Sequence, residues 1–309
     1  MDNLNFKNHS LYSVYSIDTA INSLLVFYKN NFAKLFAMSL IMAAILQYAM
    51  TYIDIASIQS ENDINVLIEK MGEATIPLGI IVFLNLFFVV IIQHYIMFSP
   101  LDENSSIVNS ITGSFKYLFP YIVTVTLLVI FGGMAITFGL VLLFIGAFFA
   151  ALYVVTLFLF ILPIMIVEGV DISHTIRRTF KLAHKDFWIN IGWVAVFIAL
   201  FLLITIIISG LILAPFAGNF LQSIFNPGET ANYAEITQKP LYIVLLIIAN
   251  ALTMPLIPLL SAILYFNGIA KEDAGQRGNF TETEEKKITV EDLYAKPYFE
   301  DQPEKKYDN

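Results

Sequence analysis

The longest uncharged stretch of the chain, residues 117–167, contains no Asp, Glu, Lys or Arg. Folded as one α-helix, this stretch would be about 76 Å long, because each residue adds about 1.5 Å along the helix axis. The hydrocarbon core of a bilayer is only about 30 Å thick. We therefore expect the stretch to cross a membrane twice, with a tight turn near Gly139 and Gly146, whose small size also permits close helix approach.

The composition agrees with membrane insertion. Of the 309 residues, 58% are hydrophobic and only 14% are charged, with a mean hydropathy of +0.73. Soluble domains carry about 25% charged residues. The chain has no Cys, which excludes disulfides and thiolate-bound metals. The net charge of −8 argues against nucleic-acid binding, because nucleic acids are bound by basic surfaces.

The hydropathy pattern predicts an all-α integral membrane protein with six membrane-spanning helices. Their expected limits are residues 32–53, 75–98, 120–143, 145–167, 188–214 and 240–266. Of the 17 Lys and Arg residues, only Lys70 and Lys239 fall in the loops that follow the first and fifth spans. Basic residues accumulate in cytoplasmic loops. We therefore predict that both termini are cytoplasmic.

A related pattern precedes the first, third and fifth spans. The segments SIDTAINSLLVFYKNNF, SIVNSITGSFKYLF and DISHTIRRTFKLAHKDF begin at Ser16, Ser106 and Asp171. Each has a helix N-cap residue followed by Ile, with apolar residues four and eight positions further on, on one helix face. The pattern predicts three units, each an amphipathic helix at the membrane interface followed by a transmembrane hairpin. Alternatively, these are three unrelated juxtamembrane helices, and the pattern leaves that choice open.

The third of these segments is the most basic, and we expect its basic face to contact anionic lipid headgroups. The basic residues of that face are Arg177, Arg178, Lys181 and Lys185. Glu168, just before the segment, is expected to pair with Arg177 or Arg178. Trp188 and Trp193 are expected to anchor the start of the fifth span at the interface, where Trp is enriched.

The chain divides into a membrane domain, residues 1–270, and a charged cytoplasmic tail, residues 271–309. The tail has few aliphatic residues and many charges of both signs, which predicts disorder. Within it, ITVEDLYAKPYF places apolar residues among acids and could fold on a protein partner. The alternative is a merely solvated tail.

Polar residues inside the expected spans are candidates for a transport path. They are Asn85, Gln93, His94 and Asn250. Polar groups at this depth face protein or water rather than lipid. The simpler interpretation is that they join helices through hydrogen bonds. Pro255 and Pro258 are expected to kink or break the sixth span, because Pro lacks the backbone N–H that a helix needs.

The segment PIMIVEGVDISHTIRRTFKLAHKDFWINIGW, residues 163–193, resembles a family motif. Such a sequence is found in uncharacterised bacterial six-span proteins related to the membrane domain of glycerophosphodiester phosphodiesterases and to the YciC-type proteins. The residues that carry the resemblance are Pro163, Glu168, Gly169, Arg177, Arg178, Thr179, Phe180, Leu182, Phe187 and Trp188. Leu264-Tyr265-Phe266 resembles the end of the last span, but Asn267-Gly268-Ile269 replaces the acid and basic pair that usually follow. The resemblance implies a bacterial inner-membrane protein and no established activity.

We expect no enzymatic function, because none of the HExxH, GxSxG, P-loop or GxGxxG motifs occurs. No cofactor or bound metal is expected, and the expected partners are membrane lipids and a protein that binds the tail. The sequence favours a scaffold or accessory component of a membrane or envelope complex. The alternative is a small-molecule or lipid carrier with a cavity between the hairpins.

Overall fold

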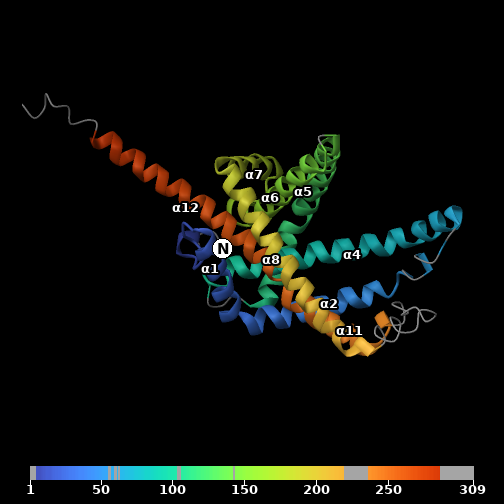
Figure 1. Ribbon diagram of the computed structural model, residues 1–309. Helices are drawn as coiled ribbons and strands as arrows, with labels where there is room; N and C mark the ends of the chain where they lie inside the picture. Colours follow the sequence, from blue (N-terminus) through green and yellow to red (C-terminus); the bar gives the residue numbers. More distant parts are fainter. Residues whose placement is uncertain are drawn as a thin grey trace, which may run out of the picture.

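Figure 1 shows a computed structural model of the chain. It describes residues 5–54, 57–58, 61, 63–102, 106–141, 143–218 and 236–285. These residues form helices and connecting segments, with no strand among them. The helices are η1 (Phe6–Asn8), α1 (Ile17–Asn30), α2 (Phe32–Met50), α4 (Ile64–Phe98), α5 (Ile107–Val141), α6 (Leu143–Glu168), α7 (Ile172–Lys185), α8 (Phe187–Leu213), η2 (Ala214–Phe216), α11 (Pro240–Thr253) and α12 (Leu256–Glu285).

Six helical segments are long and apolar enough to cross a membrane, which confirms the expectation of a multi-pass membrane protein. They are Phe32–Met50, Ile64–Phe98, Ile107–Val141, Phe144–Glu168, Phe187–Phe216 and Pro240–Gly275. The uncharged stretch forms two helices, because α5 ends at Val141 and α6 begins at Leu143, and Gly139 of α5 lies against Gly146 and Ala147 of α6.

The second expected amphipathic helix is not a separate element. The segment that begins at Ser106 continues without interruption into the third span, so that both belong to α5. Pro120 lies inside this helix and does not end it. Four residues later, the Thr124 hydroxyl donates a hydrogen bond to the Pro120 carbonyl at 2.9 Å. The pattern of a helix followed by a turn and a span therefore applies at most to α1 and α7.

The sixth span breaks at Pro255, as expected. α11 ends at Thr253 and α12 begins at Leu256. Of the segment expected to be disordered, residues 271–285 belong to α12, which continues to Glu285. Residues 271–274 are Lys, Glu, Asp and Ala, mostly good helix formers that extend an established helix. The ITVEDLYAKPYF segment lies outside the described residues.

The core lies where the C-terminal ends of α4 and α6 meet the first half of α12. Its largest fully buried side chains include Tyr95, Phe160, Tyr265 and Phe266. In Figure 1, α4 and the adjacent helices α5 and α6 extend away from this core, α2 lies beside α11, and α12 leaves the core on the opposite side. The N-terminal segment, residues 5–16, packs against the same core.

Close approach of α5 and α6 depends on Gly139. A Cβ at this position would lie 2.7 Å from backbone atoms of Gly146 and Ala147, which cannot move aside as a flexible side chain can. We expect Gly139→Ala to lower the free energy of unfolding by about 1–3 kcal/mol through overpacking. Denaturant unfolding in detergent micelles measures this change.

Gly133→Ala is the matched control, since it lies on the same helix and a Cβ there would have no atom within 4 Å. This control is expected to be neutral or slightly stabilising, because Ala has the higher helix propensity. Equal effects of the two substitutions would contradict the importance of the close approach.

Candidate functional site: an ionic cluster at one end of the helices

The cluster begins at the turn between α6 and α7. α6 ends at Glu168, and Gly169 follows with a φ of 116°, a backbone conformation that favours glycine. Asp171 then caps α7, because its carboxylate accepts a hydrogen bond from the Ser173 N–H at 3.0 Å. α7 packs back against α6, so the turn brings the basic residues of α7 to the carboxylate at the end of α6.

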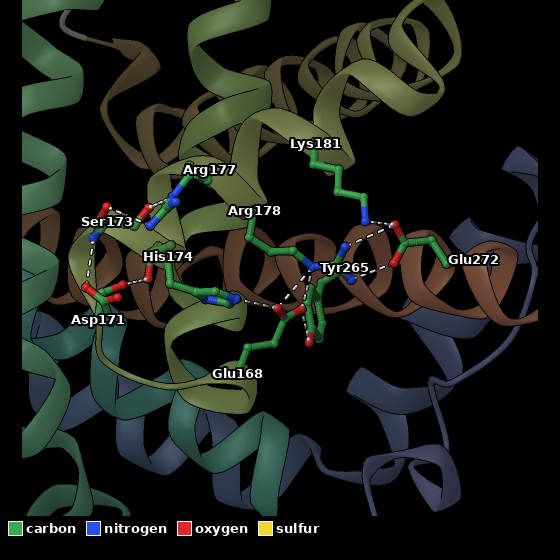
Figure 2. Close-up of polar contacts among 10 residues, drawn as sticks. Glu168, Asp171, Ser173, His174, Arg177, Arg178, Lys181, Tyr265 and Glu272 are labelled. Atoms are coloured by element: carbon green, nitrogen blue, oxygen red, sulfur yellow. Dashed lines mark hydrogen bonds and ion pairs between the residues drawn. The ribbon is translucent and has the colours of Figure 1, made fainter.

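Arg178 occupies the centre of the cluster, between two carboxylates (Figure 2). Its Nε donates to both oxygens of Glu168, at 2.9 and 3.0 Å. Its Nη1 and Nη2 donate to Oε1 and Oε2 of Glu272 on α12, at 3.0 and 2.6 Å. One guanidinium therefore joins α6, α7 and α12, using the planar, bidentate geometry that Lys cannot reproduce.

Three neighbours complete the cluster. The Tyr265 hydroxyl of α12 donates to Glu168 Oε1 at 3.1 Å. His174 Nε2 lies 3.7 Å from Glu168 Oε2, and Lys181 Nζ lies 3.7 Å from Glu272 Oε1. The side chains of Arg178, Glu272 and Glu168 are only 14%, 15% and 20% exposed, so their charges have largely exchanged water for one another.

The pKa of Arg178 is raised above its ordinary value. Burial alone would lower this pKa, but hydrogen bonds to Glu272 and Glu168 and their negative charges outweigh the burial. Arg178 therefore stays protonated at any physiological pH. This arrangement of paired opposite charges stabilises a tertiary contact and does not present a reactive group.

Two further ion pairs lie on α12 one residue either side of Glu272. Lys271 Nζ contacts Asp186, just before α8, at 2.7 Å. Asp273 pairs with Lys7 and accepts a hydrogen bond from the Tyr12 hydroxyl at 2.6 Å. Consecutive residues of α12 thus hold the start of α8, the helix α7 and the N-terminal segment.

The N-terminal segment is also held by His9, which is 3% exposed. The Leu11 N–H donates to His9 Nδ1 at 3.0 Å, so the ring proton is on Nε2, which donates to the Ile96 carbonyl of α4 at 3.0 Å. The ring stacks on Phe266 of α12 with a centroid distance of 4.4 Å. Burial lowers the pKa of His9 to about 4, against a smaller opposing effect of the bond to Ile96.

The expected headgroup contacts divide into two groups. Arg177, Lys181 and Lys185 are exposed, and Arg177 donates to the Ser173 hydroxyl at 3.1 Å. The guanidinium of Arg178, by contrast, is half-buried and donates hydrogen bonds to the carboxylates of Glu168 and Glu272. The expected pairing of Glu168 is confirmed for Arg178.

The two Trp residues that were expected to anchor the fifth span differ in their exposure. Trp188 is 71% exposed, and its ring meets those of Phe149 and Phe187 edge to face. Trp193 is only 7% exposed and belongs to the core, so its ring packs against other side chains and does not lie at the surface. A position five residues further along α8 faces a different side of the helix.

The intramembrane polar residues do not gather at one place. Asn85 and Asn250 are exposed. Gln93 is buried and lines a cavity of only about 10 Å³ with Tyr121 and Ser261. His94 is buried on the next position of α4 and packs against Gly113 of α5. Two larger cavities, of about 340 and 270 Å³, have none of the four in their walls.

Sequence reasoning missed Glu272, Tyr265 and His9. Tyr265 and Glu272 are seven residues apart, which places them on one face of a helix. This signal was available, but it crosses residue 271, where a disordered tail was expected to begin. His9 had no pattern that could have revealed it, since its partners are distant in sequence. The same holds for Asn267, which accepts a hydrogen bond from the Tyr15 N–H at 2.9 Å.

Comparison with known proteins adds no relative: no family model, no curated protein and no solved structure matches this chain.

Proposed function

We propose that this protein is a non-enzymatic scaffold or accessory component of a membrane or envelope complex. The observation that carries the proposal is the ionic cluster around Arg178. It ties α6, α7 and α12 together just before α12 leaves the helix body and continues to Glu285 (Figure 1). A helix fixed at its base in this way can present the following residues, 286–309, to a partner.

The proposal includes a location, the cytoplasmic membrane of a bacterium, with both termini in the cytoplasm. The support is the concentration of Lys and Arg in the segments on one side of the six spans. The six spans would form three hairpins, with α1 and α7 near the cytoplasmic interface. Arg177, Lys181 and Lys185 would then meet anionic headgroups, each worth about 1 kcal/mol near such a surface. The resemblance to bacterial six-span proteins agrees with this location.

A carrier for ions or polar molecules is less well supported. Such a carrier needs polar groups that converge on a cavity. Asn85 and Asn250 are exposed, and the cavity beside Gln93 has room for no more than about one water molecule. His94 is buried and packs against Gly113 of α5, which favours a role in helix packing for this residue.

Removal of residues 286–309 tests the scaffold proposal. A chain that ends at Glu285 keeps the whole ionic cluster, so its fold should be unchanged. Cross-linking in cells, purification in mild detergent and mass spectrometry should recover a protein partner with the full chain. We expect at least about fivefold lower recovery with the shortened chain, because a short linear motif would supply most of the contact.

The matched control keeps residues 286–309 and replaces Lys29 with Gln, a change on an exposed side chain of α1. It should recover the partner at the full yield. A full-length protein that purifies without any partner, or a shortened chain that keeps the same partner at the same yield, would contradict the proposal.

A further inference from the structure

A cavity of about 270 Å³ lies between α5, α6 and α7. Its walls are almost entirely apolar. They include Leu128 and Phe131 of α5, Leu157 and Ile161 of α6, and Ile176 and Phe180 of α7. Each of these is a long apolar side chain on or beside a membrane-spanning helix. The chemistry of the walls therefore fits a hydrocarbon chain rather than a water-soluble ligand.

One polar group in these walls has no hydrogen-bond partner among the residues that the structure describes. Thr179 of α7 lines the cavity and is 3% exposed, yet its Oγ1 makes no hydrogen bond. A Thr in a helix can adopt either of two χ1 rotamers, so its hydroxyl can point toward a bound molecule. Thr124 also lines the cavity, but its hydroxyl already donates to the Pro120 carbonyl. The cavity thus contains one hydroxyl group without a hydrogen bond among the described residues. A buried polar group that lacks a hydrogen bond costs free energy.

A cation lies beside the cavity on the exposed side of α7. Arg177 is three residues before Phe180, and residues at this spacing are neighbours on a helix surface. Its guanidinium extends back to Ser173, to whose carbonyl and hydroxyl it donates hydrogen bonds. Unlike Arg178, it contacts no carboxylate in the part of the chain that the structure describes. The site therefore combines an apolar cavity, a free hydroxyl and an exposed positive charge.

We propose that this cavity binds an acyl chain of an anionic phospholipid. The chain lies against Leu128, Leu157 and Phe180, its ester carbonyl accepts a hydrogen bond from the Thr179 hydroxyl, and its phosphate lies against Arg177. The inference rests on the proposed contact of α7 with anionic headgroups and adds to it a specific site. The cavity of about 340 Å³ between α1, α6, α8 and α12 has no polar atom in its walls and carries no such argument.

Two Thr→Val substitutions test the site. Thr179→Val removes the free hydroxyl, whereas Thr124→Val removes a hydroxyl from the same cavity that is already satisfied within α5. The full chain is reconstituted in nanodiscs of equal parts phosphatidylglycerol and phosphatidylcholine, released in mild detergent and analysed by native mass spectrometry. We expect Thr179→Val to retain about fivefold less phosphatidylglycerol than the wild type and Thr124→Val to retain the wild-type amount.

Two further arms locate the contact. Leu128→Trp fills the cavity and should abolish lipid retention. Leu200→Trp, in the other cavity, should leave the amount of retained lipid unchanged. Arg177→Gln should remove the preference for phosphatidylglycerol over phosphatidylcholine while some lipid remains bound. Equal retention by wild type, Thr179→Val and Leu128→Trp would overturn the proposal.

Cross-linking of the wild-type protein gives an answer even if a variant fails to fold. A phosphatidylglycerol with a photoreactive group on its acyl chain should label peptides containing residues 124–131 and 157–161. Labelling confined to other peptides would contradict the proposed position of the acyl chain. Because these readouts do not involve residues 286–309, failure here is separate from failure of the scaffold proposal.

Discussion

Replacing Arg178 with Gln is expected to lower the free energy of unfolding by about 3 kcal/mol, the lower end of the range for breaking a buried ion pair. Arg178 is the cation that Glu168 and Glu272 share, and all three side chains are at most 20% exposed. Without the guanidinium, two carboxylates would face each other with little water between them. Unfolding by SDS in mixed micelles, followed by circular dichroism, measures the change.

Arg177→Gln provides the matched control, since it changes the preceding residue in the same helix by the same chemistry. Arg177 is exposed and contacts Ser173 rather than a carboxylate, so the expected effect is below about 0.5 kcal/mol. Arg178→Lys should recover only part of the loss, because Lys cannot bind Glu168 and Glu272 in the same geometry.

A double-mutant cycle assigns the loss to the ion pair. Adding Glu272→Gln to Arg178→Gln removes one of the two carboxylates that have lost the guanidinium and should recover part of the lost stability. The two substitutions are therefore expected to be strongly non-additive, as for residues in direct contact. Additive effects, or equal stability of Arg178→Gln and Arg177→Gln, would show that the cluster does not stabilise the fold.

The membrane-spanning helices were predictable from sequence because their signal is local. An uncharged stretch too long for one crossing predicts two helices, and Pro255 coincides with the break between α11 and α12. Helix limits were harder to predict. A separate amphipathic helix before the third span would need a turn near Lys116. The local sequence does not require such a turn, and α5 runs without interruption from Ile107.

The candidate site was only half predictable. Glu168 and the basic residues of α7 are close in sequence, so their pairing followed from spacing, although the choice between Arg177 and Arg178 did not. Arg178 is selected by Glu272, which is 94 residues away along the chain. Long-range pairings of this kind depend on how helices pack, and a single sequence carries no direct record of packing.

The same limit applied to His9, whose contacts lead to a prediction about pH. Its ring is neutral in the folded protein and joins α4 to α12 through Ile96 and Phe266. The pKa of His9 is lowered to about 4 in the folded state, compared with 6.5 for a freely solvated His. A group whose folded pKa is lowered contributes its stability fully above the unfolded pKa and loses it as the pH falls toward the folded pKa.

We therefore expect the protein to lose stability as the pH falls from about 6.5 to about 4, by up to about 3 kcal/mol from His9 alone. Other groups also titrate in this range, so the informative quantity is the difference between the wild type and His9→Gln. Gln cannot take up a proton, and this variant should be less stable at pH 7 but should lack the part of the pH dependence that belongs to His9. Asn8→Gln, at the neighbouring exposed position, is the control and should follow the wild-type curve.

Hydrogen exchange gives a local readout of the same event. Protonation of His9 places a second proton on Nδ1, where the Leu11 N–H is now bound, so the two donors would face each other. The amides of residues 9–15 should therefore exchange faster at pH 5 than at pH 7, after correction for the intrinsic rate. In His9→Gln the corrected rates should not differ between the two pH values. Parallel stability curves for the wild type and His9→Gln would mean that the N-terminal segment is held by Lys7, Tyr12 and Tyr15 and not by the neutral ring of His9.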